Sequence, residues 1–295
     1  MLAIYKKELK TYFSTMIGYA FIAFFSLVVG FVFYYINVLG ATAFVGYALR
    51  YAYIAVVMMV LVPVLTMKIF ADERHQKTDQ MLFTAPVTVG RIVMGKFLAV
   101  ATVFTIPVLV MFTYPLIMSD YGNTPVAANY VAIIGFWLMG LALFAIGCFV
   151  SSVTENQIIS AVITFAILLL IFILQYISGI FPTGELASAI AICLFIFVFA
   201  LIYWLIARKT TKNALLYGGI IAVAGIAVVI ILYFVNGSMF DGLLQNILLR
   251  CSVYYMYSYY FSAEIIDIGS LVYFVSVIGF FLFLTVQSVQ KRRWS

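Results

Sequence analysis

Apolar residues along the chain are gathered into long stretches that are separated by short polar segments. A helix needs about 20 mostly apolar residues to cross the hydrocarbon core of a bilayer. Eight stretches meet this requirement without a charged residue in their interior: 16–39, 51–67, 97–118, 130–150, 158–180, 186–207, 214–235 and 270–287. Pro63, Pro107 and Pro115 lie within the second and third stretches, where proline kinks a membrane helix without preventing it. We therefore predict an all-α polytopic membrane protein with about eight transmembrane helices.

The composition agrees with a membrane environment. Hydrophobic residues make up 66% of the 295 residues, whereas charged residues make up 9%. A soluble domain carries about 25% charged residues, so this chain has too few charges to cover its apolar surface in water. The first apolar stretch is longer than the roughly 7 to 15 residues of a signal-peptide core, and we expect no removable signal peptide.

The basic residues indicate how the chain is oriented. If the N-terminus is cytoplasmic, 14 of the 16 Lys and Arg residues fall in cytoplasmic segments, and Arg50 and Arg250 fall outside. The ten acidic residues divide evenly between the two sides, so the bias is the Lys and Arg bias that sets topology. We predict that both termini are cytoplasmic. The net charge of +6 then reflects retention of positive charge on one side of a membrane, and no nucleic-acid partner is expected.

The stretch 186–235 has two interpretations. Three basic residues lie in the turn 208–213, which favours a cytoplasmic turn and eight spans. The alternative is a protein of six spans in which 186–235 stays on the outer side.

Two cytoplasmic segments carry patterns of their own. In 1–15, Leu2, Tyr5, Leu9 and Tyr12 recur at helical spacing beside three lysines, which predicts an amphipathic helix whose lysines face anionic lipid headgroups, with a disordered basic tail as the alternative. The connection 68–96 holds eight charges, then an apolar cluster of Met81, Leu82 and Phe83, then Pro86, and Thr88 can cap the helix that follows. An apolar cluster in a charged loop predicts a docking surface for a partner.

The outer segment 238–269 is also patterned. Ser238 and Asp241 have the spacing of a capping box, and an amphipathic helix is expected over 243–251. A tyrosine-rich run follows, with Tyr254, Tyr255, Tyr257, Tyr259 and Tyr260. Amphipathic rings suit the headgroup level of a bilayer, so the run is either an aromatic anchor in an interfacial or re-entrant segment, or an outer gate that contacts substrate.

Catalytic and metal chemistry find little support. The segment from Gly90 to Phe97 approaches the phosphate-binding pattern G-x-x-x-x-G-K-S/T, but Phe97 has no hydroxyl for magnesium, and Lys96 is better interpreted as an interfacial anchor. One histidine and three scattered cysteines predict neither a metal site nor a catalytic group. The charge-free spans argue against an ion-coupled carrier. Small residues such as Gly147 and Ser151 indicate close helix packing.

Several segments together resemble a known family. The segments are 1–13, 72–86, 95–97, 154–157 and 282–294, and they are similar to the type-2 ABC exporter permeases. Within that superfamily the chain most resembles the gliding-motility permease branch (GldF-like), which is similar to the nitrous-oxide-reductase maturation permeases (NosY-like). Two features depart from the family: Lys77 stands where many relatives carry glycine, and 186–235 looks like a helix hairpin added to a six-span core.

The resemblance implies one transmembrane permease domain over 1–295 in a bacterial plasma (inner) membrane. It implies a dimer with a second permease copy or a paralogue, two ABC ATPase subunits that bind ATP and magnesium, and an outer accessory protein, with no cofactor in this chain. Segment 1–15 would be the elbow helix and 68–96 the coupling-helix loop. The implied ATPase-coupling residues are Asp72, Glu73, Arg74, Thr78, Met81, Leu82, Phe83, Thr84, Pro86, Glu155, Asn156 and Gln157.

The leading hypothesis is therefore an ABC exporter permease that couples ATP hydrolysis by a separate subunit to the movement of an unidentified substrate. The alternative is a membrane scaffold or sensor subunit that binds an ATPase without transporting. A secondary carrier is a third hypothesis, which the charge-free spans disfavour.

Overall fold

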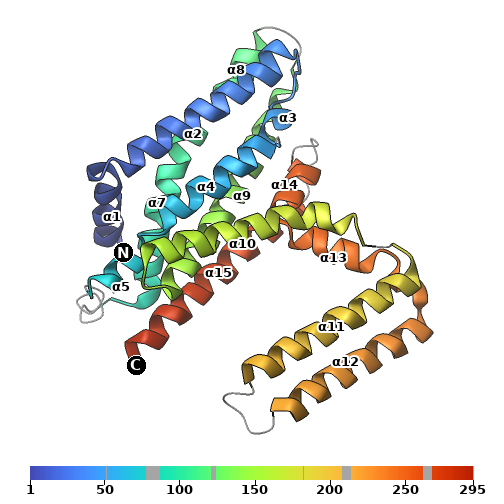
Figure 1. The fold of residues 1–295 in the computed structure, drawn as a ribbon. Helices are drawn as coiled ribbons and strands as arrows, with labels where there is room; N and C mark the ends of the chain where they lie inside the picture. The colour runs from blue at the N-terminus through green and yellow to red at the C-terminus, as the bar shows by residue number, and fades with distance from the viewer. Residues whose placement is uncertain are drawn as a thin grey trace. The chain divides into compact units, whose positions relative to one another are not determined.

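The computed structural model describes residues 1–50, 52–77, 87–120, 124–181, 183–207, 214–261 and 268–294, and all regular elements within these ranges are helices. The chain divides into two compact units (Figure 1). Unit 1 comprises Met1–Phe172 and Val253–Ser295, and unit 2 comprises Ile173–Ser252.

Most helices belong to unit 1. They are α1 (Leu2–Ser14), α2 (Ile17–Phe33) with its π-helical continuation η1 (Tyr34–Leu39), α3 (Val45–Leu49), α4 (Ala52–Thr66), α5 (Ala71–His75), α7 (Val89–Met111), α8 (Tyr114–Ser119), α9 (Val126–Val153), α14 (Val253–Tyr260) and α15 (Ile268–Trp294). Helix α10 (Gln157–Ser178) begins in unit 1 and ends in unit 2.

Within the described residues, six helical segments are long and apolar enough to cross a membrane. They are Ile17–Leu39, Ala52–His75, Val89–Ser119, Val126–Val153, Gln157–Ser178 and Ile268–Arg292. Six of the eight predicted stretches are thereby confirmed as candidate spans. The other two form α11 (Glu185–Ala207) and α12 (Ala214–Val235), whose described apolar parts are shorter, and the turn 208–213 lies outside the described residues. The eight-span arrangement stays a prediction.

The helices and the apolar stretches differ at several boundaries. Helix α7 begins at Val89, upstream of the apolar stretch 97–118, because its first two turns carry polar residues that the apolar count excludes. Thr88 is the residue that precedes α7, as predicted, but its side chain makes no capping hydrogen bond. After Met111 the third stretch is interrupted, and it resumes as α8 with Pro115 in the first turn, where proline is tolerated. The short buried helix α3 was not predicted.

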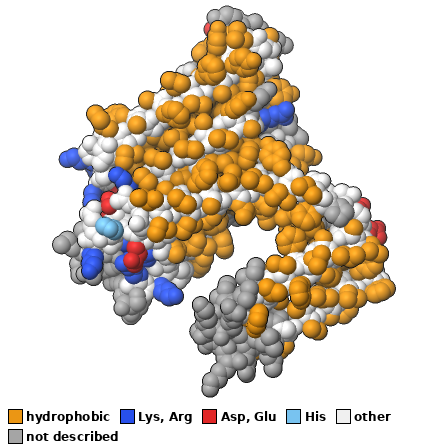
Figure 2. Space-filling view, viewed as in Figure 1, with side chains coloured by type: hydrophobic (Ala, Val, Ile, Leu, Met, Phe, Trp, Pro, Cys, Tyr) orange, Lys and Arg blue, Asp and Glu red, His pale blue; other side chains and the backbone are white. Residues whose placement is uncertain are grey.

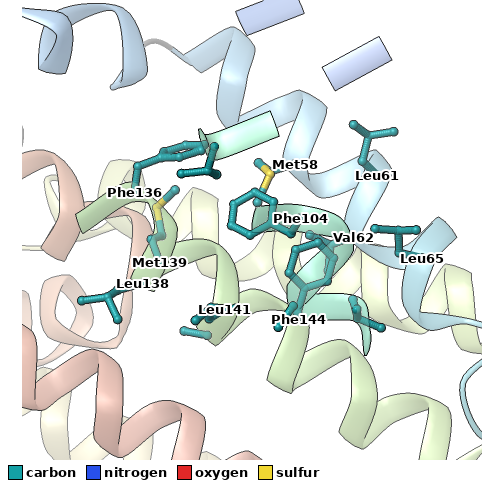
Figure 3. Packing of buried hydrophobic residues seen from close by; sticks show 14 of the residues in the cluster. Met58, Leu61, Val62, Leu65, Phe104, Phe136, Leu138, Met139, Leu141 and Phe144 are labelled. Carbon is teal, nitrogen blue, oxygen red and sulfur yellow. The ribbon is translucent and has the colours of Figure 1, made fainter. Parts of the chain in front are cut away.

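The core of unit 1 lies around α9, the most buried of the six candidate spans. An aromatic group formed by Phe25, Phe104, Phe136 and Phe144 fills the space between α2, α7 and α9, with the ring centroids of the contacting pairs 5.2 to 6.2 Å apart. Figure 3 shows Phe104, Phe136 and Phe144 of this group. Gly140 makes this packing possible, because a methyl group there would lie 2.3 Å from the ring of Phe104. Helix α9 is apolar on all sides, as expected for a helix surrounded by other helices.

Unit 2 is built on the antiparallel pair α11 and α12, followed by the 3-10 turn η2 (Gly237–Phe240) and α13 (Leu243–Cys251). Gly225 of α12 lies against Ile196 of α11, at a distance where a methyl group would come within 2.8 Å. The predicted capping box is wrong. Ser238 donates to Asn236 instead, and α13 begins after Gly242, whose φ of 63° interrupts the helix upstream. The predicted helix 243–251 is confirmed.

Candidate functional site

A buried ion network lies at the end of unit 1 where both termini are found. Lys96, in the second turn of α7, is 1% exposed. Its ammonium nitrogen lies 3.0 Å from Oε1 of Glu8 in α1 and 3.0 Å from Oε2 of Glu73 in α5. Lys7 adds a second cation 3.3 Å from Oε1 of Glu73. Figure 2 shows most of the charged side chains on this face gathered at the same end. The interpretation of Lys96 as an interfacial anchor is therefore wrong.

The surroundings of Lys96 satisfy its charge and its protons. A buried ammonium group is costly unless it is paired and hydrogen-bonded. Lys96 also donates to the carbonyl oxygen of Ile69 at 2.7 Å, so three oxygen atoms surround a group with three protons. The ring of Phe70 lies 5.2 Å from the nitrogen, within cation–π range. The network therefore holds α1, α5 and α7 together through the ammonium group of Lys96.

Helix α1 packs through the face that carries Glu8. The hydroxyl of Tyr12 is buried and donates to the carbonyl oxygen of Leu65 at 2.8 Å, and the hydroxyl of Tyr5 lies 3.1 Å from Oγ1 of Thr102. Burial raises the pKa of Tyr12 well above its ordinary value, with smaller contributions from Cys148 and Glu8, so this hydroxyl stays neutral and able to donate. The predicted helix in 1–15 is confirmed, and the alternative of a disordered tail is wrong.

The break between α4 and α5 rests on α9. Ser151 of α9 accepts hydrogen bonds from the backbone N–H groups of Phe70 and Ala71 at 3.1 and 3.2 Å, and donates to the carbonyl of Met67 at 3.3 Å. One turn earlier, Gly147 lies directly against Thr66. A small residue and a hydroxyl on α9 thus fix the position from which the loop 68–96 begins.

The two predicted coupling segments meet in the structure. Oδ1 of Asp72 accepts a hydrogen bond from Nε2 of Gln157 at 2.5 Å, and Nη1 of Arg74 donates to the carbonyl of Thr154 at 3.4 Å. Asn156 accepts from the backbone N–H of Ile158 at 2.8 Å, which stabilises the start of α10. The contacts of Asp72 with Gln157 and of Arg74 with Thr154 join residues 85 and 80 positions apart in the sequence into one polar surface.

The remaining predicted coupling residues cannot be placed in this surface. Thr78, Met81, Leu82, Phe83, Thr84 and Pro86 lie outside the described residues. Lys77 comes immediately before them, with a φ of 55° in the left-handed region. Glycine adopts this conformation without strain, which gives a physical reason for glycine at this position in the proteins that the chain resembles.

Sequence reasoning missed Glu8 and the burial of Lys96, and it assigned Ser151 to close helix packing without its hydrogen bonds to Phe70 and Ala71. A signal for Glu8 was present, since it is the only acidic residue of 1–15 and lies between Tyr5 and Tyr12 on the apolar helical face. A carboxylate on such a face predicts a buried cationic partner. Nothing in the local pattern identified Lys96 as that partner.

The five tyrosines of the outer segment occupy different environments. Tyr254 and Tyr257 are buried, Tyr255 and Tyr260 are half-buried, and Tyr259 is exposed. The hydroxyl of Tyr254 donates to the carbonyl of Arg50, and the ring of Tyr257 packs against Phe136 with centroids 5.8 Å apart. The anchor interpretation is therefore wrong for Tyr254 and Tyr257, which hold α14 on the core. The ring of Tyr259 contacts the rings of Tyr255 and Tyr260, with centroids 5.4 and 4.9 Å apart.

The two buried tyrosines give a matched pair of variants. Tyr254→Phe removes a hydrogen bond and leaves the carbonyl of Arg50 short of a donor, so we expect a loss of about 1 kcal/mol in the free energy of unfolding. The hydroxyl of Tyr257 is buried and has no partner within the described part of the chain, so Tyr257→Phe should leave stability unchanged or raise it. Thermal unfolding in detergent measures both, with Tyr259→Phe as the exposed control. Equal losses in the two buried variants would contradict this assignment.

The fold and this surface define a class, namely a multi-pass helical membrane protein with a polar surface at one end of its helices. The chain matches the family described as ABC-2 family transporter protein over residues 2–187, and it therefore belongs to that family. No curated protein and no solved structure matches the chain. Members of this family are the membrane subunits of ABC transporters and lack an ATPase domain, so membership makes the chain such a membrane subunit and implies a separate ABC ATPase partner and a dimer.

Proposed function

We propose that this chain is the permease subunit of an ABC exporter, and that the ATPase subunit docks on the surface formed by α5 and the residues 154–157 and also contacts the sequence segment 78–86, which lies outside the described residues. The observation that carries the proposal is the pairing of Asp72 with Gln157 and of Arg74 with Thr154. These pairs bring the two segments expected to contact the ATPase into one surface. The sequence adds the apolar cluster of Met81, Leu82 and Phe83 to the same loop.

The proposal includes a route by which movement of the ATPase reaches the membrane helices. Glu73 is next to Asp72 in α5 and is paired with Lys96 of α7, which is paired in turn with Glu8 of α1. A displacement of α5 therefore changes the position of two other helices through buried ion pairs rather than through a flexible loop. Such a rigid connection suits a two-state rearrangement of packed helices.

The assembly follows from the same proposal. Two permease chains, identical or paralogous, bind two ATPase subunits that hold ATP and magnesium, in a bacterial inner membrane with both termini cytoplasmic. Support comes from the position of both termini at the charged end of unit 1 (Figure 1). We further propose that the chain belongs to the gliding-motility branch, that α11 and α12 are the added hairpin of eight spans, and that an outer accessory protein binds opposite the ATPase. The family match ends at residue 187, close to the start of α11.

Co-expression with an ABC ATPase encoded beside this chain tests the docking surface. We expect Leu82→Asp to reduce the co-purified ATPase at least about tenfold, as for a charge placed in an interface core. Asp72→Ala removes the hydrogen bond to Gln157, so we expect the ATPase rate to lose its dependence on the permease. Asp120→Ala, an exposed carboxylate outside this surface, is the control.

The outcomes separate the hypotheses. Unchanged binding and unchanged ATPase coupling in well-folded Leu82→Asp and Asp72→Ala samples would refute the docking surface. Normal binding by the unmodified chain with no effect on the ATPase rate would instead favour the scaffold or sensor hypothesis.

A further inference from the structure

A groove of about 550 Å³ runs between the C-terminal ends of α9 and α15, beside α5. Neither Asp72 nor Gln157 is among the residues that line it. The residues that line it are Arg74, Phe149, Val153, Leu284, Gln287, Ser288, Lys291 and Arg292.

The two helices that form the groove run in the same direction. The rings of Phe149 and Phe281 lie 5.9 Å apart, and one to two turns further on Ser288 donates to the carbonyl of Ser152 at 3.2 Å. Both helices therefore end at the charged end of unit 1.

The chemistry of the groove changes along its length. Phe149 and Leu284 form the part nearer the centre of the helices, whereas Lys291 and Arg292 lie at the ends. From Leu284 to Lys291 the helix rises about 10 Å. An apolar part that continues into a cationic part over this distance matches a phospholipid, in which acyl chains continue into an anionic headgroup.

The charge of the groove selects an anionic headgroup. Its described lining contains three cations, Arg74, Lys291 and Arg292, and no carboxylate. Glu155, which is 75% exposed, lies 3.5 Å from Nη2 of Arg292 and is not among the lining residues. Basic pockets between membrane helices commonly bind the headgroups of anionic lipids.

We propose that the groove between α9 and α15 is a binding site for one anionic phospholipid, with the phosphate beside Lys291 and Arg292 and an acyl chain along Phe149 and Leu284. The apolar depth of the groove favours a lipid over a soluble phosphate, which would use only the cationic end. It also favours a lipid over a contact of the ATPase subunit, because Phe149 and Leu284 belong to candidate membrane spans.

Native mass spectrometry of the full-length chain, alone and co-expressed with the neighbouring ATPase, tests the site. The probes are phosphatidylglycerol, phosphatidylcholine and glycerol 3-phosphate. We expect one strongly retained phosphatidylglycerol per chain, and weaker retention of the other two probes. The double variant Lys291→Gln, Arg292→Gln should weaken phosphatidylglycerol binding on the order of tenfold, since each cation near a headgroup contributes measurably. Lys10→Gln, an exposed lysine on α1, controls for general surface charge.

Each contrary outcome overturns the proposal. Unchanged phosphatidylglycerol binding in a double variant that elutes as the native protein places the lipid elsewhere. Equal weakening by Lys10→Gln reduces the effect to general electrostatics. Equal retention of phosphatidylcholine or glycerol 3-phosphate removes the specificity for an anionic lipid. Loss of the ATPase with lipid retention intact assigns the groove to the ATPase contact.

Discussion

Replacement of Lys96 by methionine is expected to lower the free energy of unfolding by about 3 kcal/mol, the lower part of the range for removing one partner of a buried ion pair. Methionine keeps most of the length of the side chain and removes its charge and its protons. Glu8 and Glu73 are then left close together without the cation that both contact, and the carbonyl of Ile69 loses its donor. The two carboxylates are 13% and 17% exposed, so water compensates part of the loss.

The variant should also separate coupling from ATPase binding. The surface around Asp72 is untouched, so ATPase binding is retained, whereas the ion pairs of α7 with α1 and α5 are lost and only the pair of Lys7 with Glu73 still joins α1 to α5. Thermal unfolding in detergent and the permease-dependent ATPase rate measure the two effects, with the exposed Lys10→Met as the control. Adding Glu8→Gln and Glu73→Gln to Lys96→Met removes the repulsion and should recover part of the stability. A Lys96→Met protein that melts and couples like the unmodified chain would show that the network carries neither function.

The candidate spans could be predicted because the membrane imposes a local requirement. About 20 apolar residues must follow one another in the chain, so α9 and α10 are recognisable without knowledge of their neighbours. The apolar count alone misses the start of α7, because Arg91 and Lys96 interrupt the count although the helix continues through them, and it was Thr88 that marked this start. The family resemblance set 186–235 apart as an added hairpin, but the grouping of α11 and α12 with α13 and the end of α10 in one compact unit depends on tertiary contacts that no local pattern encodes.

The candidate site could be predicted only in outline. The sequence identified Asp72 and Gln157 as members of two coupling segments through a family resemblance, and their hydrogen bond depends on how α9 positions both. The burial of Lys96 was missed because a lysine at the end of an apolar stretch is ordinarily solvated or interfacial, and only the arrival of α1 and α5 covers it. For the same reason Tyr254 and Tyr257 differ from Tyr259 although all three belong to one run.

Replacement of Gly147 by valine is expected to be the second strongly disruptive change, at about 2 kcal/mol or more for overpacking a buried contact. A methyl group at Gly147 would lie 2.5 Å from Oγ1, 2.8 Å from Cγ2 and 2.9 Å from Cβ of Thr66. Because both branches and the stem of the threonine are too close, no rotation of its side chain opens the space, and Thr66 is itself fully buried. Helix α4 must therefore move away from α9.

This displacement should reach the coupling surface. Ser151 lies one turn after Gly147 and holds the backbone of Phe70 and Ala71, so a separation of α4 from α9 weakens the support of α5. We expect a lower thermal midpoint, by about 4 to 8 °C for a chain of this size, together with loss of the permease-dependent ATPase rate. Gly279→Val is the matched control, because Gly279 is an exposed glycine of α15 with open space at its Cβ position. Thr66→Ala removes two of the three close atoms and should partly rescue Gly147→Val. Equal effects at Gly147 and Gly279 would mean that valine in a helix, rather than the contact of α4 with α9, causes the loss.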